Sequence, residues 1–265
     1  MSDDTYDLGG GMFEEPEGYV QPPPESHFVE YERILGKANP AKIQLKLVGK
    51  SPLWGHLLWN AGKYTANYLD EHSEELVKGK KVLELGAAAG LPSLICAVNG
   101  ASKVIVTDYP DADLISHIQY NVDHLEGVPA STDIKVKGFI WGQNTSSLCY
   151  DKIYDSDDLP KVIDEKEKFD LVILSDLVFN HTEHRKLLSN CRDCMKKDGV
   201  ALVVFSPHRP WLLEADLQFF VTCEEFDFKA EKVEQVNWKP MFDEDEETVE
   251  VRSRVYCYKL VPQWN

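Results

Sequence analysis

Continuous apolar runs alternate with amphipathic segments over most of the chain. The apolar runs are typical of strands buried on both faces, and segments with apolar residues three and four positions apart are typical of helices. The predicted strands are 81–85, 104–107, 134–140, 169–174, 199–205, 226–236 and 249–260. The predicted helices are 54–72, 91–98, 111–125, 183–195 and 211–223. This alternation predicts an α/β fold in which a mostly parallel sheet carries helices on both faces.

Three segments depart from the alternation. The last two predicted strands have only an acidic loop between them, so we expect an antiparallel pair at the edge of the sheet. A polar loop, 142–167, is long enough to be an insertion or a functional lid. Upstream of the first helix, Ile43, Leu45 and Leu47 alternate with polar residues and predict a short strand.

The first residues differ in composition from the rest of the chain. Residues 1–27 hold a glycine run, several acids and three consecutive prolines, with too few apolar side chains to offset the entropy of ordering. The sequence therefore predicts a disordered, acidic and proline-rich tail over 1–27 and one folded domain over 28–265.

Charge narrows the classes of partner. The chain has 28 Lys and Arg against 45 Asp and Glu, which gives a formal net charge of −17. Binding to nucleic acid or to anionic lipid depends on basic residues, so neither partner is expected. Solubility is the simplest reason for the excess, although an acidic surface would also attract a cationic partner. The sequence contains no run of 18 apolar residues, so no membrane span is predicted.

The six cysteines are scattered over predicted helices, strands and a loop, which is typical of reduced thiols rather than a disulfide framework. Cys191 and Cys194 form a C-x-x-C pair inside a predicted helix, without a second Cys or His pair at zinc spacing. No metal site is therefore predicted.

The first candidate binding motif is the strand–turn–helix segment 82–90, VLELGAAAG. Glycine at 86 and 90 lets the backbone turn sharply and approach a ligand at the carboxyl ends of parallel strands. A dinucleotide site, G-x-G-x-x-G, would need a small residue at position 91, which is Leu91. The spacing instead resembles the E-x-G-x-G-x-G pattern of methyltransferases, with Ala88 in place of the middle glycine.

Two acids accompany this turn. Asp108 ends the next predicted strand, where a carboxylate can accept hydrogen bonds from vicinal ribose hydroxyls. Its alternative role is an N-cap of the following helix, for which Asp111 is at least as well placed. Glu84 lies inside the first strand, where an unpaired buried carboxylate would be costly. Its alternative is a solvated position at the sheet edge.

These motifs and the predicted strand count resemble the class I methyltransferases over roughly residues 50–260. The resemblance implies a Rossmann-like, seven-stranded, mostly parallel sheet with an antiparallel last strand. It also implies S-adenosylmethionine as cofactor. The cofactor-binding residues that follow are Trp59, Glu84, Gly86, Ala87, Ala88, Gly90, Asp108, Trp141 and Ser175.

Two tryptophans sharpen the resemblance. Trp141 in FIWG and Trp59 in LWNAG resemble the W-G and W-x-A patterns of a group of protein lysine methyltransferases. The resemblance places Trp141 where its indole could flank an adenine. Either side chain could instead belong to the core, where large aromatic surfaces are usually buried.

The loop after the fourth strand lines the methionine moiety and the substrate pocket in class I methyltransferases. The same group of protein lysine methyltransferases typically has an acid, two hydrophobic residues and Tyr in this loop, whereas this chain has Asp176, two hydrophobic residues and then Phe179. An α-amine, with a pKa of about 7.7–8.0, needs no strong base, unlike a lysine near ~10.4. Asp176 and Asn180 are therefore candidate catalytic residues that orient the amine. His181 is a further candidate for orienting the amine, although packing and capping of the next helix is the favoured role for both His181 and His184.

Residues 7–19, DLGGGMFEEPEGY, resemble the tail of a fungal methyltransferase family acting on translation elongation factor 1-alpha. The resemblance implies a protein N-methyltransferase for the N-terminal glycine α-amine and the adjacent lysine of that factor. We expect a cytoplasmic monomer.

Three other functions stay open at this point. The nearest is a small-molecule amine N-methyltransferase, acting on a substrate such as nicotinamide. A non-catalytic adaptor would be favoured by loss of the ribose acid or by a bulky residue in the glycine turn, and the sequence has neither. A nicotinamide-cofactor oxidoreductase is disfavoured by the glycine spacing.

Overall fold

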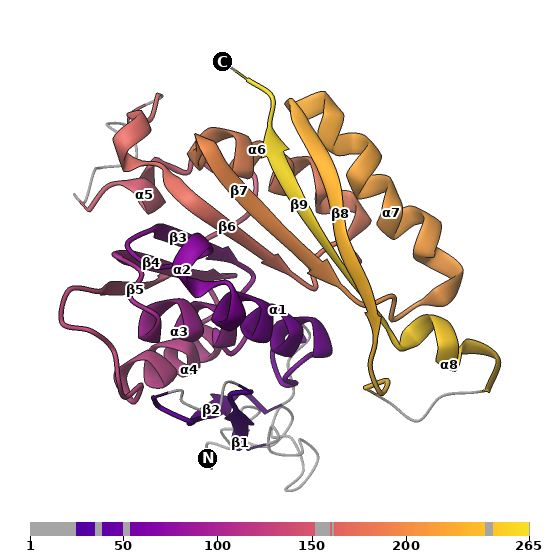
Figure 1. Ribbon diagram of the computed structural model, residues 1–265, viewed down its shortest axis with the longest axis horizontal. Coiled ribbons are helices and arrows are strands. Elements are labelled where there is room, and N and C mark those ends of the chain that lie inside the picture. Colours follow the sequence, from indigo (N-terminus) through magenta and orange to yellow (C-terminus); the bar gives the residue numbers. More distant parts are fainter. Residues whose placement is uncertain are drawn as a thin grey trace, which may run out of the picture.

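The computed structural model describes residues 25–34, 39–49, 54–151, 160, 162–241 and 246–264. Its centre is a seven-stranded sheet with the strand order β5-β4-β3-β6-β7-β9-β8 (Figure 1). The strands are β3 (Lys81–Leu85), β4 (Lys103–Asp108), β5 (Asp133–Gly138), β6 (Phe169–Ser175), β7 (Met195–Phe205), β8 (Phe228–Asn237) and β9 (Arg254–Pro262). Strands β3 to β7 pair in parallel, and β9 is antiparallel to both β7 and β8. The predicted α/β sheet with an antiparallel last strand is confirmed.

Helices cover both faces of this sheet (Figure 1). One face carries α1 (Asn60–Glu71), α2 (Ser73–Leu76), α3 (Leu91–Val98) and α4 (Ala112–Asp123). The other carries α5 (Ser146–Cys149), α6 (His184–Cys194) and α7 (Leu213–Thr222). A further helix, α8 (Glu246–Arg252), lies in the connection between β8 and β9. None of the helices in the described ranges is long and apolar enough to cross a membrane.

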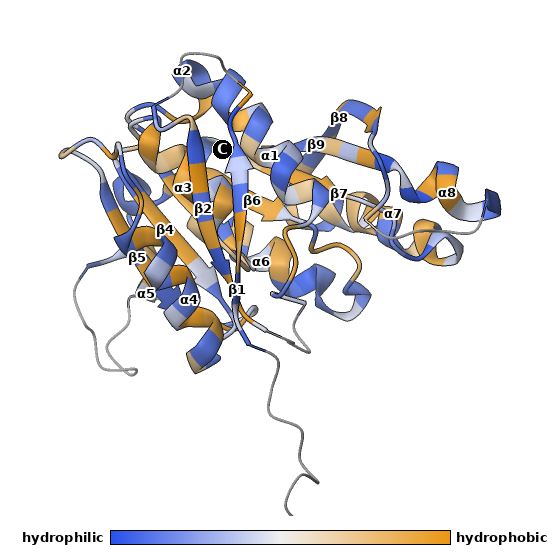
Figure 2. Ribbon diagram, turned by 90° about the horizontal axis from the view of Figure 1, so that it is seen from below, coloured by the Kyte–Doolittle hydropathy of each residue, from blue (hydrophilic) through white to orange (hydrophobic). Residues whose placement is uncertain are grey.

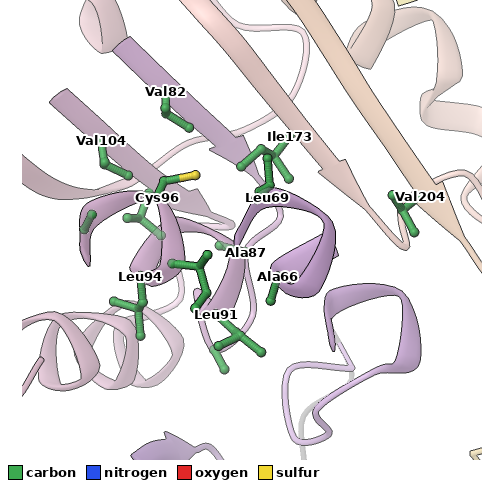
Figure 3. Close-up of a cluster of buried hydrophobic side chains, with 14 of the residues drawn as sticks. Ala66, Leu69, Val82, Ala87, Leu91, Leu94, Cys96, Val104, Ile173 and Val204 are labelled. Carbon is green, nitrogen blue, oxygen red and sulfur yellow. The ribbon is translucent and has the colours of Figure 1, made fainter. Parts of the chain in front are cut away.

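The core has two parts because successive residues of a strand point to opposite faces. Val82 of β3 joins the cluster under α1 and α3, whereas Leu83 joins the cluster under α6 and α7. Figure 3 shows the first cluster, in which Leu69 of α1 lies beside Ile173 of β6 and to which Leu94 of α3 also belongs. In Figure 2, β4 and α3 are mostly hydrophobic, whereas α4 and α8 carry residues of both kinds.

A separate two-stranded sheet, β1 (His27–Glu32) with β2 (Lys42–Leu47), packs against α4. The predicted short strand is confirmed as β2, in which Ile43, Leu45 and Leu47 are buried. The predicted tail falls mostly outside the described residues, and its last residue, His27, already pairs in β1.

Several predicted boundaries were wrong, among them that of the strand expected from 199, which already begins at Met195. The first helix begins at Asn60 rather than at 54, because Trp54 has a φ of 62° and Trp59 is extended. The strand expected over 249–260 begins only at Arg254. The β-branched residues Val249 and Val251 suggested a strand, but Glu246 and Glu247 favour a helix start and α8 forms instead. The segment 142–167 contains α5 and a short 3₁₀ turn, Glu165–Glu167, and part of it lies outside the described residues.

Candidate active site

A pocket of about 860 Å³ opens at the carboxyl ends of the parallel strands. This volume lies in the range of small-molecule sites, about 300–1,000 Å³. Every predicted site residue except Gly90 lines it. The predicted residues in the lining are Trp59, Glu84, Gly86, Ala87, Ala88, Asp108, Trp141, Ser175, Asp176 and Asn180.

The glycine turn after β3 forms the floor of one half of the pocket. Gly86 has a φ of +65°, and a Cβ there would lie 2.6 Å from Leu177 Cδ2 and 3.1 Å from Trp141 Cζ2. The missing side chain therefore lets Leu177 and Trp141 lie close against the backbone of the turn. Gly90 has a φ of +79° and its amide donates to Ala87 O at 2.7 Å. It closes the turn before α3 rather than facing the pocket.

Asp108 faces this turn from the end of β4. Its carboxylate accepts hydrogen bonds from the amides of Ala88 and Tyr109, both at 2.7 Å. Burial raises the pKa of Asp108 to about 6, although the two amide hydrogen bonds oppose the shift. Asp111, not Asp108, caps α4, since it accepts from Leu114 N at 3.0 Å. Each carboxylate oxygen of Asp108 keeps further acceptor capacity.

Glu84 is 1% exposed, so the alternative of a solvated position at the sheet edge was wrong. Its Oε2 accepts from the hydroxyl of Ser93 and, at 3.0 Å, from the amide of Ser93 in the first turn of α3. Burial raises the pKa of Glu84 to about 8 despite these hydrogen bonds. A cation in the pocket would favour its carboxylate form.

Three tryptophans surround the opening. Trp141 follows β5 and lies over the glycine turn. Trp59 stands at the start of α1, and its indole Nε1 donates to Trp54 O at 3.0 Å. Trp54 itself is 52% exposed and also lines the pocket. Both predicted tryptophans thus line the pocket and contribute to its aromatic surface.

The other half of the pocket lies after β6 and β7. Ser175 ends β6 and its hydroxyl accepts from Thr65 Oγ1 at 3.3 Å. Asp176 follows with a φ of 60°, and its Oδ2 lies 2.8 Å from Nε2 of His208. Asn180 lines the same wall and accepts from Thr182 Oγ1 at 3.2 Å.

Sequence reasoning missed several pocket residues on this side. His208 and Arg209 follow β7, and Arg252 comes from the end of α8. The segment 206–210, SPHRP, directly follows a predicted parallel strand, so its position at the carboxyl edge could have marked it. Nothing comparable in the sequence marks Arg252, because α8 was not predicted. Tyr109, which is 50% exposed, was also missed although it follows Asp108.

The other histidines lie outside the lining. His181 Nε2 is 2.7 Å from Asp216 Oδ1. His184 is buried, bonds to Val178 O at 2.6 Å and packs on Phe219. All six cysteines are free and buried. Within the ranges that the structure describes, no three His, Cys, Asp or Glu side chains form a group that could hold a metal ion.

The pocket thus combines an apolar wall beside a bare backbone turn, a carboxylate at the next strand and a polar end beside β6 and β7. The first half suits a flat, hydroxylated ligand, and the buried Glu84 between the halves suits a positive charge. The second half places hydrogen-bonding groups where a second reactant would enter.

Comparisons with known proteins agree with this arrangement. Residues 39–226 match the lysine methyltransferase family. A relative from Debaryomyces hansenii, named Protein N-terminal and lysine N-methyltransferase EFM7, is 61% identical over 264 residues, which is 100% of both chains. A relative of the same name from Schizosaccharomyces pombe is 39% identical over 98% of both chains.

Solved structures share the fold at low identity. A methyltransferase solved with S-adenosylhomocysteine (SAH) superposes with a TM-score of 0.52 at 14% identity, covering 92% of this chain and 58% of that one. A Streptococcus mutans protein assigned as a SAM-dependent methyltransferase gives a TM-score of 0.53 at 14% identity, with 92% and 57% covered. The predicted methyltransferase class is confirmed, and the predicted S-adenosylmethionine cofactor agrees with these findings. The chain therefore belongs to the lysine methyltransferase family.

Proposed function

We propose that this chain is an S-adenosylmethionine-dependent protein N-methyltransferase that acts on translation elongation factor 1-alpha. Its acceptors are the N-terminal glycine α-amine and the adjacent lysine. The observation that carries the proposal is the single pocket that joins the glycine turn and Asp108 to the polar end at Asp176. The relatives' names, which state N-terminal and lysine N-methylation, support the type of acceptor.

The residues of the first half fit the cofactor. The missing side chain of Gly86 lets Leu177 and Trp141 lie close to the backbone, and these two side chains give the pocket an apolar wall against which a flat ring can pack. Asp108 holds the ribose hydroxyls, and Glu84 and Ser175 lie toward the methionine end. When bound, S-adenosylmethionine supplies an activated methyl group on a positively charged sulfur.

The protein's own task is to position the amine and to keep water out. The reacting atoms must be brought to about 3–3.5 Å in line, and such positioning removes several kcal/mol of the barrier. Asp176 and Asn180 orient the amine at the polar end of the pocket. The buried apolar surface around them excludes competing water.

Charge supports a basic protein segment as substrate. The net charge of −17 would attract a positively charged chain end and would hold off nucleic acid. The resemblance of residues 7–19 supports elongation factor 1-alpha in particular. The protein acts as a monomer in the cytoplasm, which size measurement in solution and microscopy of the tagged chain would test.

The decisive experiment incubates the full chain with radiolabelled S-adenosylmethionine and either elongation factor 1-alpha or nicotinamide. We expect label on the factor, which mass spectrometry assigns to the first residue and the adjacent lysine. A factor with an acetylated N-terminus is the matched control and should lose the α-amine label only. Label on nicotinamide alone would overturn the protein substrate and favour the small-molecule enzyme.

A further inference from the structure

His208 is an ionisable group at the polar end of the pocket that sequence reasoning did not find. It lies three residues after β7, lines the pocket and packs its ring against Trp59 with 4.7 Å between ring centroids. Its side chain is 24% exposed, whereas that of its partner Asp176 is 9% exposed. The imidazole, rather than the carboxylate, is therefore the part of this pair that an entering substrate reaches first.

Asp176 directly follows β6 and is held by two hydrogen bonds to the end of β7, in addition to its contact with His208. Its amide donates to Val204 O at 2.7 Å, and its Oδ1 accepts from Ser206 N at 3.2 Å. The remaining oxygen, Oδ2, lies 2.8 Å from His208 Nε2. A carboxylate accepts only, so Nε2 carries the proton and donates to it. This arrangement orients the ring as a carboxylate does in other acid–base pairs of enzymes.

The second ring nitrogen then carries the lone pair. In the neutral tautomer with a proton on Nε2, Nδ1 is an acceptor. Across the described ranges, the side-chain hydrogen bond of His208 involves Nε2 and leaves Nδ1 for a ligand. The sheet order puts His208 on the β6–β7 side of the pocket, away from the glycine turn and Asp108 on the β3–β4 side. His208 thus lies at the end of the pocket where the acceptor is proposed to enter.

We propose that His208, oriented by Asp176, removes a proton from the substrate ammonium before methyl transfer. This inference rests on the proposed function. The ammonium gives one N–H proton to Nδ1, which leaves a neutral amine and an imidazolium. The amine lone pair then forms the new N–C bond, the methyl–sulfur bond breaks and its electron pair stays on sulfur. The methylated amine keeps its positive charge, and His208 returns its proton to water.

The charges around His208 suit this role. Burial, the largest influence, lowers the pKa of His208, but Asp176 and then Asp216 of α7 outweigh it and leave the pKa raised. Arg252 of α8 opposes them, and the neighbouring Arg209 donates to Phe179 O at 2.7 Å. A histidine whose pKa is raised above its usual value of about 6.5 lies closer to the pKa of an α-ammonium, about 7.7–8.0, than to that of lysine, about 10.4. It therefore accepts a proton from the α-ammonium more easily.

His181 provides a matched control. It also pairs with an aspartate, Asp216, at 2.7 Å, and its side chain is 29% exposed, yet it does not line the pocket. We expect H181N and H208N both to fold and to bind SAH in calorimetry with wild-type affinity. H181N should stay within threefold of wild-type kcat. H208N should lose about 100-fold or more of kcat at pH 7 with little change in KM.

The pH profile separates proton transfer from a structural role. Wild-type kcat should rise with pH and level off once His208 is neutral, whereas H208N should keep rising as the substrate amine itself loses its proton. D176N, which keeps an acceptor for Nε2 but no charge, should shift the rising limb to lower pH. A second substitution, H208Q, gives the same test if H208N unfolds.

Two results would overturn the inference. One is an H208N or H208Q kcat within threefold of wild type at every pH, and the other is loss of SAH affinity that matches the loss of activity. If the wild-type chain itself neither binds SAH nor methylates protein, the proposed function fails instead.

Discussion

At the scale of single residues, the pocket depends on an absent side chain and on a buried acid two positions before it. Gly86 lets Trp141 and Leu177 lie close to the backbone, and Glu84 places a carboxyl group where burial favours its neutral form. Both lie on one short segment of β3 and its turn. The physical consequences of the two differ, because one is steric and the other depends on pH.

The first prediction concerns G86A. A Cβ would meet Leu177 and Trp141, and alanine is strained at a φ of +65° by about 1–2 kcal/mol. We expect SAH affinity to fall at least tenfold in calorimetry. G100A is the matched control, because Gly100 has a φ of +80° and nothing lies within 4 Å of its Cβ position. Equal SAH affinity in G86A and wild type would contradict the assignment of the glycine turn to the cofactor.

The second prediction concerns E84Q in the protein without cofactor. The folded pKa of Glu84, about 8, lies above its unfolded value of 4.5. The folded state therefore binds the extra proton between these values, so wild-type stability falls as pH rises from about 4.5 to 8. A glutamine oxygen keeps both bonds from Ser93 without this proton linkage. We expect E84Q to become more stable than wild type by about 1 kcal/mol or more between pH 6 and 8.

Urea unfolding at pH 6, 7 and 8 measures this difference. E74Q serves as control, since Glu74 is an exposed partner of Lys78 on the short helix α2. Parallel pH profiles for E84Q and wild type would show that Glu84 titrates normally.

At the scale of elements, the long and strongly patterned segments were predictable and the connections were not. The strand 81–85 and the helix 91–98 have their predicted bounds, because both are apolar and end at a glycine or turn. The helix α8 was missed because two β-branched valines outweigh its short helical pattern. The packing of β1 and β2 against α4 follows from contacts between distant residues, which periodicity cannot reveal.

The third prediction tests how the small sheet is attached. Asn121 of α4 is 2% exposed, accepts from Lys46 N at 2.6 Å and donates to Lys46 O and Ala89 O at 3.0 Å. N121A leaves these backbone groups without their side-chain partner, so we expect a loss of about 1–3 kcal/mol. Hydrogen exchange at the Lys46 amide should also accelerate. Q119A, on the exposed side of α4, should change neither quantity.

At the scale of the whole molecule, most of the predicted site residues could be placed together from one property of parallel sheets. Carboxyl ends of parallel strands share an edge, so the glycine turn, Asp108, Trp141 and Asp176 were expected together, and they line one pocket. The pairing of Asp176 with His208 could not be predicted, since it depends on the register between β6 and the end of β7. The same holds for Arg252, which reaches the pocket from a connection with its own helix.

The residues that line the pocket come from two parts of the chain, and α8 supplies one of them from outside the span matched by the family. The glycine turn and Asp108, which we propose to hold the donor, lie within residues 39–226, the span common to the family, whereas Arg252 lies beyond it. A connection between edge strands tolerates insertion, deletion and change of charge far better than the parallel strands do. Changes in the connection between β8 and β9 can therefore alter which acceptor enters while the proposed donor-binding residues stay the same. Divergence among relatives in substrate choice should concentrate in this connection.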